Sequence, residues 1–253
     1  VDHHTTNRII SIYPTLRNNI WCVTADSKLY LYNTHLCKFV NRGKEINEQF
    51  GIDLRVDKIY PLKTGNTWIT AKSANYLIRN YMLPDQSFEK EIIKVGQHGL
   101  RSGNVWHIWA DMKGREWILT DKGATIYNHH FSTQLPFKWI REVGENIFLA
   151  TPNGKLAVYD EKEHLVKIPM PAGVTRINQL KNTGYQLLIA TNIGLVVYNP
   201  RTFKTEVINV QSPGQPMAEV KNIYTDAYGM VWVFTDGMGV TMVNPRTGQK
   251  AWL

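Results

Sequence analysis

Short runs of β-branched and aromatic residues recur along the chain, and turns rich in Gly, Asn and Asp separate them. Residues 105–128 and 220–244 form the clearest pair, because Asp, Gly, Trp and Thr occur at the same spacing in both segments. Apolar runs of this length, bounded by turn residues, predict short β-strands. We therefore expect an all-β protein.

The same pattern occurs six times in the chain. Weaker copies occupy residues 19–33, 65–80, 145–160 and 184–199. The copies are about 42 residues apart on average, which is a period typical of propeller blades. Repetition at this period predicts one architecture for the whole chain.

One large apolar side chain, called the anchor below, marks the centre of each copy. The six anchors are Trp21, Trp68, Trp117, Phe148, Leu188 and Trp232. A buried Trp contributes a large apolar area to packing. We therefore interpret the four anchor tryptophans as structural residues that pack between neighbouring sheets.

Each copy opens with two apolar residues three positions apart: Ile9/Ile12, Val56/Ile59, Val105/Ile108, Phe137/Ile140, Val174/Ile177 and Val220/Ile223. Three further short runs follow without an intervening helical period, so each copy predicts a four-stranded antiparallel meander. Such a small sheet is not stable alone and must pack against its neighbours. The predicted fold is a β-propeller of six four-stranded blades, or seven if one has diverged, as a single propeller or propeller section over residues 8–54, 55–103, 104–135, 136–172, 173–218 and 219–253.

The repeat resembles a known family. The pattern D-x-x-G-x-x-W-x-x-T, followed by Gly and then by an apolar run ending in Tyr-Asn or Asn-Pro, is specific in residues 111–123 and 226–239. It is similar to the two-component regulator propeller repeat of Bacteroidetes hybrid two-component systems. The other copies depart from it, since residues 65–68 lack the Asp, and Phe148 and Leu188 replace Trp. Its Asp is expected to be a turn residue that binds backbone N–H groups.

The resemblance implies a function and a location. It implies a periplasmic sensor region that binds an oligosaccharide released from a complex glycan and controls glycan-utilisation genes. It also implies a longer parent protein with a histidine kinase. The expected partners are thus an oligosaccharide, the rest of the parent sensor chain and a second copy in a homodimer.

The charge pattern bears on the ligand. The formal net charge is +8, and the basic residues are scattered without a long run, which argues against direct contact with nucleic acid. A distributed positive field favours anionic partners, although a soluble surface rich in Lys would look the same. Basic and aromatic residues near the start of the innermost strands suit an acidic oligosaccharide. The predicted ligand-binding residues are Lys58, Arg101, Trp106, His107, Lys138, Trp139, Arg176 and Lys221.

No catalytic motif is recognisable, so neither catalytic residues nor a cofactor are predicted. Two His pairs, His3-His4 and His129-His130, are not expected to bind metal, because neighbours in a strand point to opposite faces. Two alternatives to a sensor remain: a protein-interaction scaffold, and a propeller polysaccharide lyase in which His107 faces the channel. Cys22 and Cys37 are interpreted as small buried residues or as a disulfide.

Overall fold

The computed structural model describes residues 8–15, 19–83, 87–245 and 247–253. Within them, the strands form six antiparallel sheets of four strands each, and in every sheet the strands pair in sequence order. This confirms the predicted all-β class. By internal contacts the chain divides into two compact units, residues 1–135 and 136–253, and each is described by itself.

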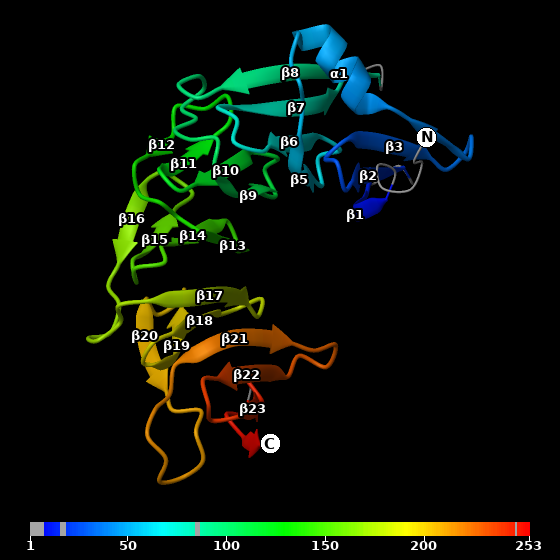
Figure 1. Ribbon diagram of the computed structural model, residues 1–253. Coiled ribbons are helices and arrows are strands. Elements are labelled where there is room, and N and C mark those ends of the chain that lie inside the picture. Colours follow the sequence, from blue (N-terminus) through cyan, green and yellow to red (C-terminus); the bar gives the residue numbers. More distant parts are fainter. Residues whose placement is uncertain (1–7, 16–18, 84–86, 246) are drawn as a thin grey trace. The chain divides into compact units, whose positions relative to one another are not determined.

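Unit 1 contains the first three sheets and a helix, drawn in blue to green in Figure 1. Sheet one consists of β1 (Ile9–Pro14), β2 (Ile20–Thr24), β3 (Leu29–Asn33) and β4 (Lys38–Val40); sheet two of β5 (Val56–Pro61), β6 (Thr67–Ala71), β7 (Tyr76–Met82) and β8 (Phe88–Lys94); and sheet three of β9 (Val105–Ala110), β10 (Glu116–Thr120), β11 (Gly123–Ile126) and β12 (Ser132–Thr133).

Unit 2 contains the other three sheets, drawn in yellow-green to red in Figure 1. Sheet four consists of β13 (Trp139–Val143), β14 (Asn146–Ala150), β15 (Leu156–Tyr159) and β16 (Leu165–Ile168); sheet five of β17 (Ile177–Asn182), β18 (Leu187–Thr191), β19 (Gly194–Asn199) and β20 (Lys204–Ile208); and sheet six of β21 (Val220–Thr225), β22 (Val231–Thr235), β23 (Val240–Val243) and β24 (Lys250–Trp252).

A bulge explains why apolar residues three positions apart are both buried in a strand whose side chains should alternate. In β5 the pairing shifts between Val56 and Lys58, and both Val56 and Ile59 are buried. A bulge adds one residue to a strand, so an odd spacing brings two side chains to the same face. The same shift follows Val220 in β21.

The predicted apolar pair is wrong in sheet five, and in sheet one it lies on β1 but is not buried. In sheet five the buried pair is Ile177 and Leu180, because β17 begins at Ile177 and its bulge follows that residue. Val174 precedes the strand. In sheet one, Ile9 and Ile12 are 43% and 63% exposed, since no described sheet covers them.

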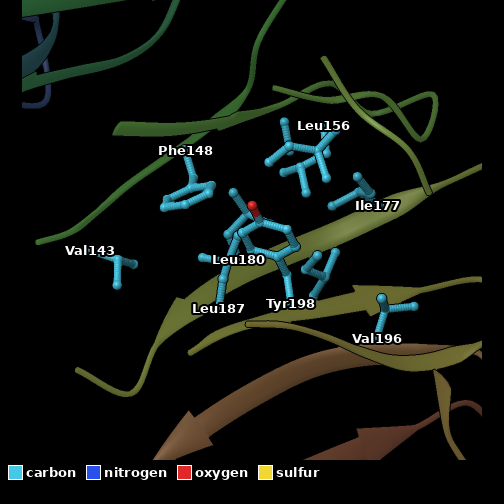
Figure 2. Close-up of a cluster of buried hydrophobic side chains, with 11 residues drawn as sticks. Val143, Phe148, Leu156, Ile177, Leu180, Leu187, Val196 and Tyr198 are labelled. Carbon is cyan, nitrogen blue, oxygen red and sulfur yellow. The ribbon is translucent and has the colours of Figure 1, made fainter. Parts of the chain in front are cut away.

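Five of the six anchors are buried, and Trp232 is partly exposed. Around Phe148, a core cluster joins sheet four to sheet five, and Figure 2 shows its ring beside Leu187 and Tyr198. The Phe148 and Tyr198 rings meet edge to face, with centroids 5.5 Å apart. Neighbouring sheets of a unit are thus held together by large apolar side chains from their two middle strands.

The repeated Asp closes a turn around the tryptophan. Asp111 accepts the indole N–H of Trp117 at 3.0 Å through Oδ2 and the backbone N–H of Arg115 at 2.9 Å through Oδ1. Gly114 within this turn has a φ of +78°, which glycine adopts without strain. Asp226 binds Trp232 in the same way, at 2.9 Å. This carboxylate is a turn residue, as its sequence position suggested.

A helix, α1 (Arg42–Phe50), follows sheet one and was not predicted; it lies between β4 and β5, so the four-stranded meander of each sheet is uninterrupted. The Asn41 side chain accepts the Lys44 backbone N–H at its start, and Gly51 ends it with a φ of +64°. Ile46 is its buried apolar side chain. A helix of nine residues with one fully buried apolar side chain produces almost no helical period in the sequence. No described helix has the length and hydropathy of a membrane span.

The cysteines and histidines also differ from expectation. Cys22 is buried, as one interpretation held, but Cys37 is exposed and both thiols are free. His129 and His130 lie in a turn rather than a strand, and their rings stack at 4.1 Å. Strand alternation therefore does not describe this pair. His3 and His4 lie outside the described residues.

Candidate functional site

The first strand of each sheet in chain order, called the inner strand below, carries one residue that pairs directly with the anchor. We call these six the anchor-level residues. They are Tyr13, Tyr60, Trp109, Arg141, Lys181 and Tyr224. The three of unit 1 are aromatic, and those of unit 2 are two cations and one aromatic residue.

In unit 1 the anchor-level Tyr60 meets a predicted site residue. Its ring lies edge-on to that of His107, with centroids 6.1 Å apart. The Tyr60 hydroxyl is buried, and no described residue forms a hydrogen bond with it. Burial, with smaller contributions from the nearby Asp57 and Tyr13, raises the pKa of Tyr60 to about 12. The phenol is therefore protonated near neutral pH, and its hydroxyl is buried.

In unit 2 the anchor-level Arg141 lies in a protein environment without an acid. Its Nη1 donates to the carbonyl of Ile140 at 2.6 Å, and it forms no ion pair with any residue that the structure describes. Burial lowers the pKa of this guanidinium. A half-buried cation without a counter-charge is costly, so an anion there would be stabilising.

The next anchor-level residue in unit 2 is also a cation. Lys181 lies over the ring of Tyr224, with Nζ 6.0 Å from the centroid. Because both Arg141 and Lys181 pair with the anchor of their own sheet, they occupy the same level on adjacent inner strands. The inner strands of unit 2 thus carry two cations and an exposed aromatic ring at one level.

Two of the predicted site residues of unit 2 are already neutralised. Arg176 and Lys221 both pair with Glu219, each at 3.0 Å, and Lys221 also pairs with Asp236 at 3.1 Å. A hydrogen bond from Asn178, followed by Lys221 and Arg176, lowers the pKa of Glu219 despite some burial. Arg176 also precedes β17 rather than lying on it. An anionic ligand would have to compete with this carboxylate.

The other predicted residues are distributed as follows. Lys138 and Trp139 adjoin each other, with the ammonium 5.3 Å from the ring centroid. Lys58 is exposed on β5, and Trp106 is half-buried on β9 beside His107. Arg101 instead donates to Ser132 of β12 at 3.2 Å, so its head group lies at the outermost strand of sheet three.

The predictions missed every anchor-level residue. A signal for them exists in the sequence, because each directly follows the second apolar residue of the opening pair, as Arg141 follows Ile140. In sheet five the rule holds only for the observed pair, Ile177 and Leu180, which Lys181 directly follows. The predicted binding residues lie nearer the start of each inner strand. The sequence does not show the cross-strand register that pairs the anchor-level residues with the anchors.

Solved structures identify the fold. No protein-family model and no curated protein sequence matches the chain. Virginiamycin B lyase from Staphylococcus aureus aligns with 99% of this chain and 85% of its own, at a TM-score of 0.56 and 11% identity. YCF48 from Cyanidioschyzon merolae aligns with 100% of this chain and 87% of its own, at 0.55 and 9%. The fold is a β-propeller.

A third neighbour is an extracellular domain. It belongs to a putative one component system of B. thetaiotaomicron and aligns with 97% of this chain at a TM-score of 0.54 and 15% identity. The chain spans 43% of that domain's length. The structural neighbours of this propeller therefore include both an extracellular regulator domain and enzymes.

Proposed function

We propose that this propeller is an extracytoplasmic ligand-sensing domain of a two-component type regulator and that it binds an anionic oligosaccharide. The observation that carries the ligand class is Arg141, a half-buried guanidinium with no ion-pair partner among the described residues. The sequence resemblance and the extracellular neighbour support the sensing role and the location. Kinase and output activities would belong to other parts of a parent protein.

The chemistry of the inner strands in unit 2 suits a sugar acid. A guanidinium can bind a carboxylate or sulfate through two parallel N–H groups, with both geometric and electrostatic gain. Lys181 adds a second positive charge at the same level. Trp139 and Tyr224 offer aromatic faces on which sugar rings stack, and Tyr224 is 56% exposed. Neutral sugars would gain the stacking but not the charge.

A thermal-shift panel tests the proposal. Oligogalacturonides and sulfated oligosaccharides are compared with neutral xylo- and gluco-oligosaccharides of equal length. We expect at least one acidic class to raise the melting temperature, because a ligand that binds only the folded state stabilises it. Equal shifts with neutral and acidic sugars, or none with either, would contradict an anionic oligosaccharide ligand.

A polysaccharide lyase is the second candidate, favoured by the Tyr60 and His107 pair in unit 1. An imidazole beside a phenol could abstract a sugar proton and protonate the leaving oxygen. β-Elimination of a uronate leaves an unsaturated product that absorbs in the ultraviolet. Growth of that absorbance with wild type but not with His107→Ala would favour the enzyme over the sensor.

A further inference from the structure

A hollow of about 720 Å³ lies in unit 1 between sheets one and two. Pro14, Thr15 and Asn19 at the ends of β1 and β2, with the turn that joins β5 to β6, form one part of its wall, and Arg42 and Lys90 form another. Asn19, Trp21 and Thr67 face it from the inner region of the two sheets. Its volume falls within the range of small-molecule sites.

The neighbouring space, between sheets two and three, holds a carboxylate. Glu116 of sheet three accepts the indole N–H of Trp68 at 2.7 Å and is also bound by the Asn66 amide N–H. Arg79 donates to both of its oxygens, at 2.8 and 3.1 Å. An Asn-x-Trp segment of one sheet and a cation thus surround an acid from the next sheet.

The repeat places the same donors at the hollow. Asn19 and Trp21 occupy the positions of Asn66 and Trp68 in the preceding copy. Glu116 directly precedes the anchor of sheet three, and the residue that directly precedes the anchor of sheet two is Thr67. The donors are therefore repeated, but the carboxylate that would bind them is replaced by a short hydroxyl side chain.

In the corresponding spaces of unit 2 the anchors Phe148 and Leu188 have no indole N–H, and apolar side chains take the acceptor position. Leu187 takes the position of Glu116 and packs with the anchor Phe148, as Figure 2 shows. Val231 takes it in sheet six and belongs to one cluster with the anchor Leu188. Among the within-unit spaces of the described chain, the space between sheets one and two therefore combines donors with an unfilled acceptor position.

Asn19 and Trp21 have polar atoms at the hollow to which no described residue forms a hydrogen bond. Asn19 Oδ1 is buried without a hydrogen bond, and neither the Asn19 amide nitrogen nor the Trp21 indole nitrogen donates to a described residue. Arg42 lies 2.6 Å and Lys90 3.7 Å from one carboxylate, that of Glu45. Arg42 and Lys90 share the single carboxylate of Glu45, so these three described side chains carry a net positive charge beside the hollow.

We propose that this hollow binds the carboxylate of a small sugar acid, which takes the place that Glu116 occupies in the next space. Trp21 Nε1 and the Asn19 amide donate to the carboxylate, Arg42 and Lys90 supply the positive charge, and Asn19 Oδ1 accepts a ligand hydroxyl. The inference rests on the fold and its repeats and is independent of the proposed function, whose residues lie in unit 2.

Two substitutions and one probe test this site. Sodium glucuronate is titrated calorimetrically into the full chain, with glucose as the neutral control. We expect glucuronate to bind and glucose to bind at least about tenfold more weakly. Asn19→Asp keeps the side-chain size but brings a like charge to the carboxylate, so it should weaken glucuronate binding by about tenfold or more. No binding to wild type, or equal affinity in Asn19→Asp, would overturn the proposal.

Thr67→Glu provides the opposite change, since it supplies an internal carboxylate. It should abolish glucuronate binding and raise the melting temperature relative to the neutral control Thr67→Gln. Unchanged glucuronate affinity in a folded Thr67→Glu would also overturn the site. Because Thr67 and Arg141 belong to different units, failure at one site is distinguishable from failure at the other.

Discussion

Trp68 donates its indole N–H to Glu116 of the adjacent sheet at 2.7 Å, and this bond joins two copies of one repeat. In sheets three and six the Trp is satisfied by an Asp of its own turn, as Asp111 satisfies Trp117. Sheet two lacks that Asp, so its Trp depends on a neighbour. The departure from the repeat pattern at residues 65–68 is thus compensated by a residue of the next copy.

We predict that Glu116→Gln destabilises unit 1 by about 3 kcal/mol, because it removes the buried charge that Trp68 and Arg79 bind and leaves Arg79 with only the more exposed Glu91. Glu116 is 5% exposed, and the side chain of its partner Arg79 is 15% exposed. Urea denaturation measures the change. The control is Glu48→Gln, whose ion pair is exposed and should contribute less than about 1 kcal/mol. Equal effects of the two substitutions would refute the structural role of Glu116.

Two tyrosines of unit 1 should respond oppositely to loss of their hydroxyl. Tyr127 donates to Glu91 at 2.8 Å, so Tyr127→Phe should cost about 1 to 2 kcal/mol. The Tyr60 hydroxyl is buried without a partner among the described residues, so Tyr60→Phe should be neutral or stabilising. Paired urea titrations compare them, and a larger loss at Tyr60 would show that its hydroxyl is satisfied in solution.

The repeat pattern could be predicted because its causes are local. Turn residues such as Gly114, anchors such as Trp117 and the period of the copies are all visible without a structure. The short helix α1 and the exposed Cys37 were not predictable, since neither produces a periodic pattern. Bulges on the inner strands explain the spacing of three between the buried apolar residues. In sheet five two such pairs overlap in the sequence, and the structure shows that Ile177 and Leu180 are the buried pair.

The binding residues were harder to predict than the fold. Basic residues near a strand start are visible in the sequence, but their counter-charges are not. Arg176 meets Glu219 because the segments before β17 and β21 are neighbours in space, whereas Arg141 meets no described acid. Whether a cation is neutralised depends on cross-strand register and on contacts between sheets, which one sequence does not reveal.

Acid should weaken unit 2 through Asp226. A hydrogen bond from Trp232, followed by backbone N–H groups, lowers the pKa of this carboxyl. A folded-state pKa below the unfolded value of about 3.9 means that its contribution is present above that pH and is lost as pH falls through the lowered folded-state pKa. Asp226→Asn should therefore reduce the fall in urea midpoint between about pH 7 and about pH 3. An identical fall in wild type and variant would contradict this assignment.

The thiols should differ in reactivity. Cys37 is exposed, whereas Cys22 is buried and burial raises its pKa. Because the thiolate is the reactive species, Ellman's reagent should modify Cys37 in the folded protein and Cys22 only after denaturation. Cys37→Ser should remove the fast reaction. Fast modification of Cys22 in this variant would show that sheet one opens in solution.

Binding of an anionic oligosaccharide by unit 2 is proposed to depend on Arg141. The most direct measurement is calorimetric titration of wild type, Arg141→Gln and the control Arg201→Gln with the acidic oligosaccharide that gives the largest thermal shift. Arg201 is exposed in the turn before β20. We expect Arg141→Gln to weaken binding by about tenfold to a hundredfold, the loss of one charged hydrogen-bonded contact, and Arg201→Gln to bind like wild type. Unchanged affinity in Arg141→Gln would contradict this proposal.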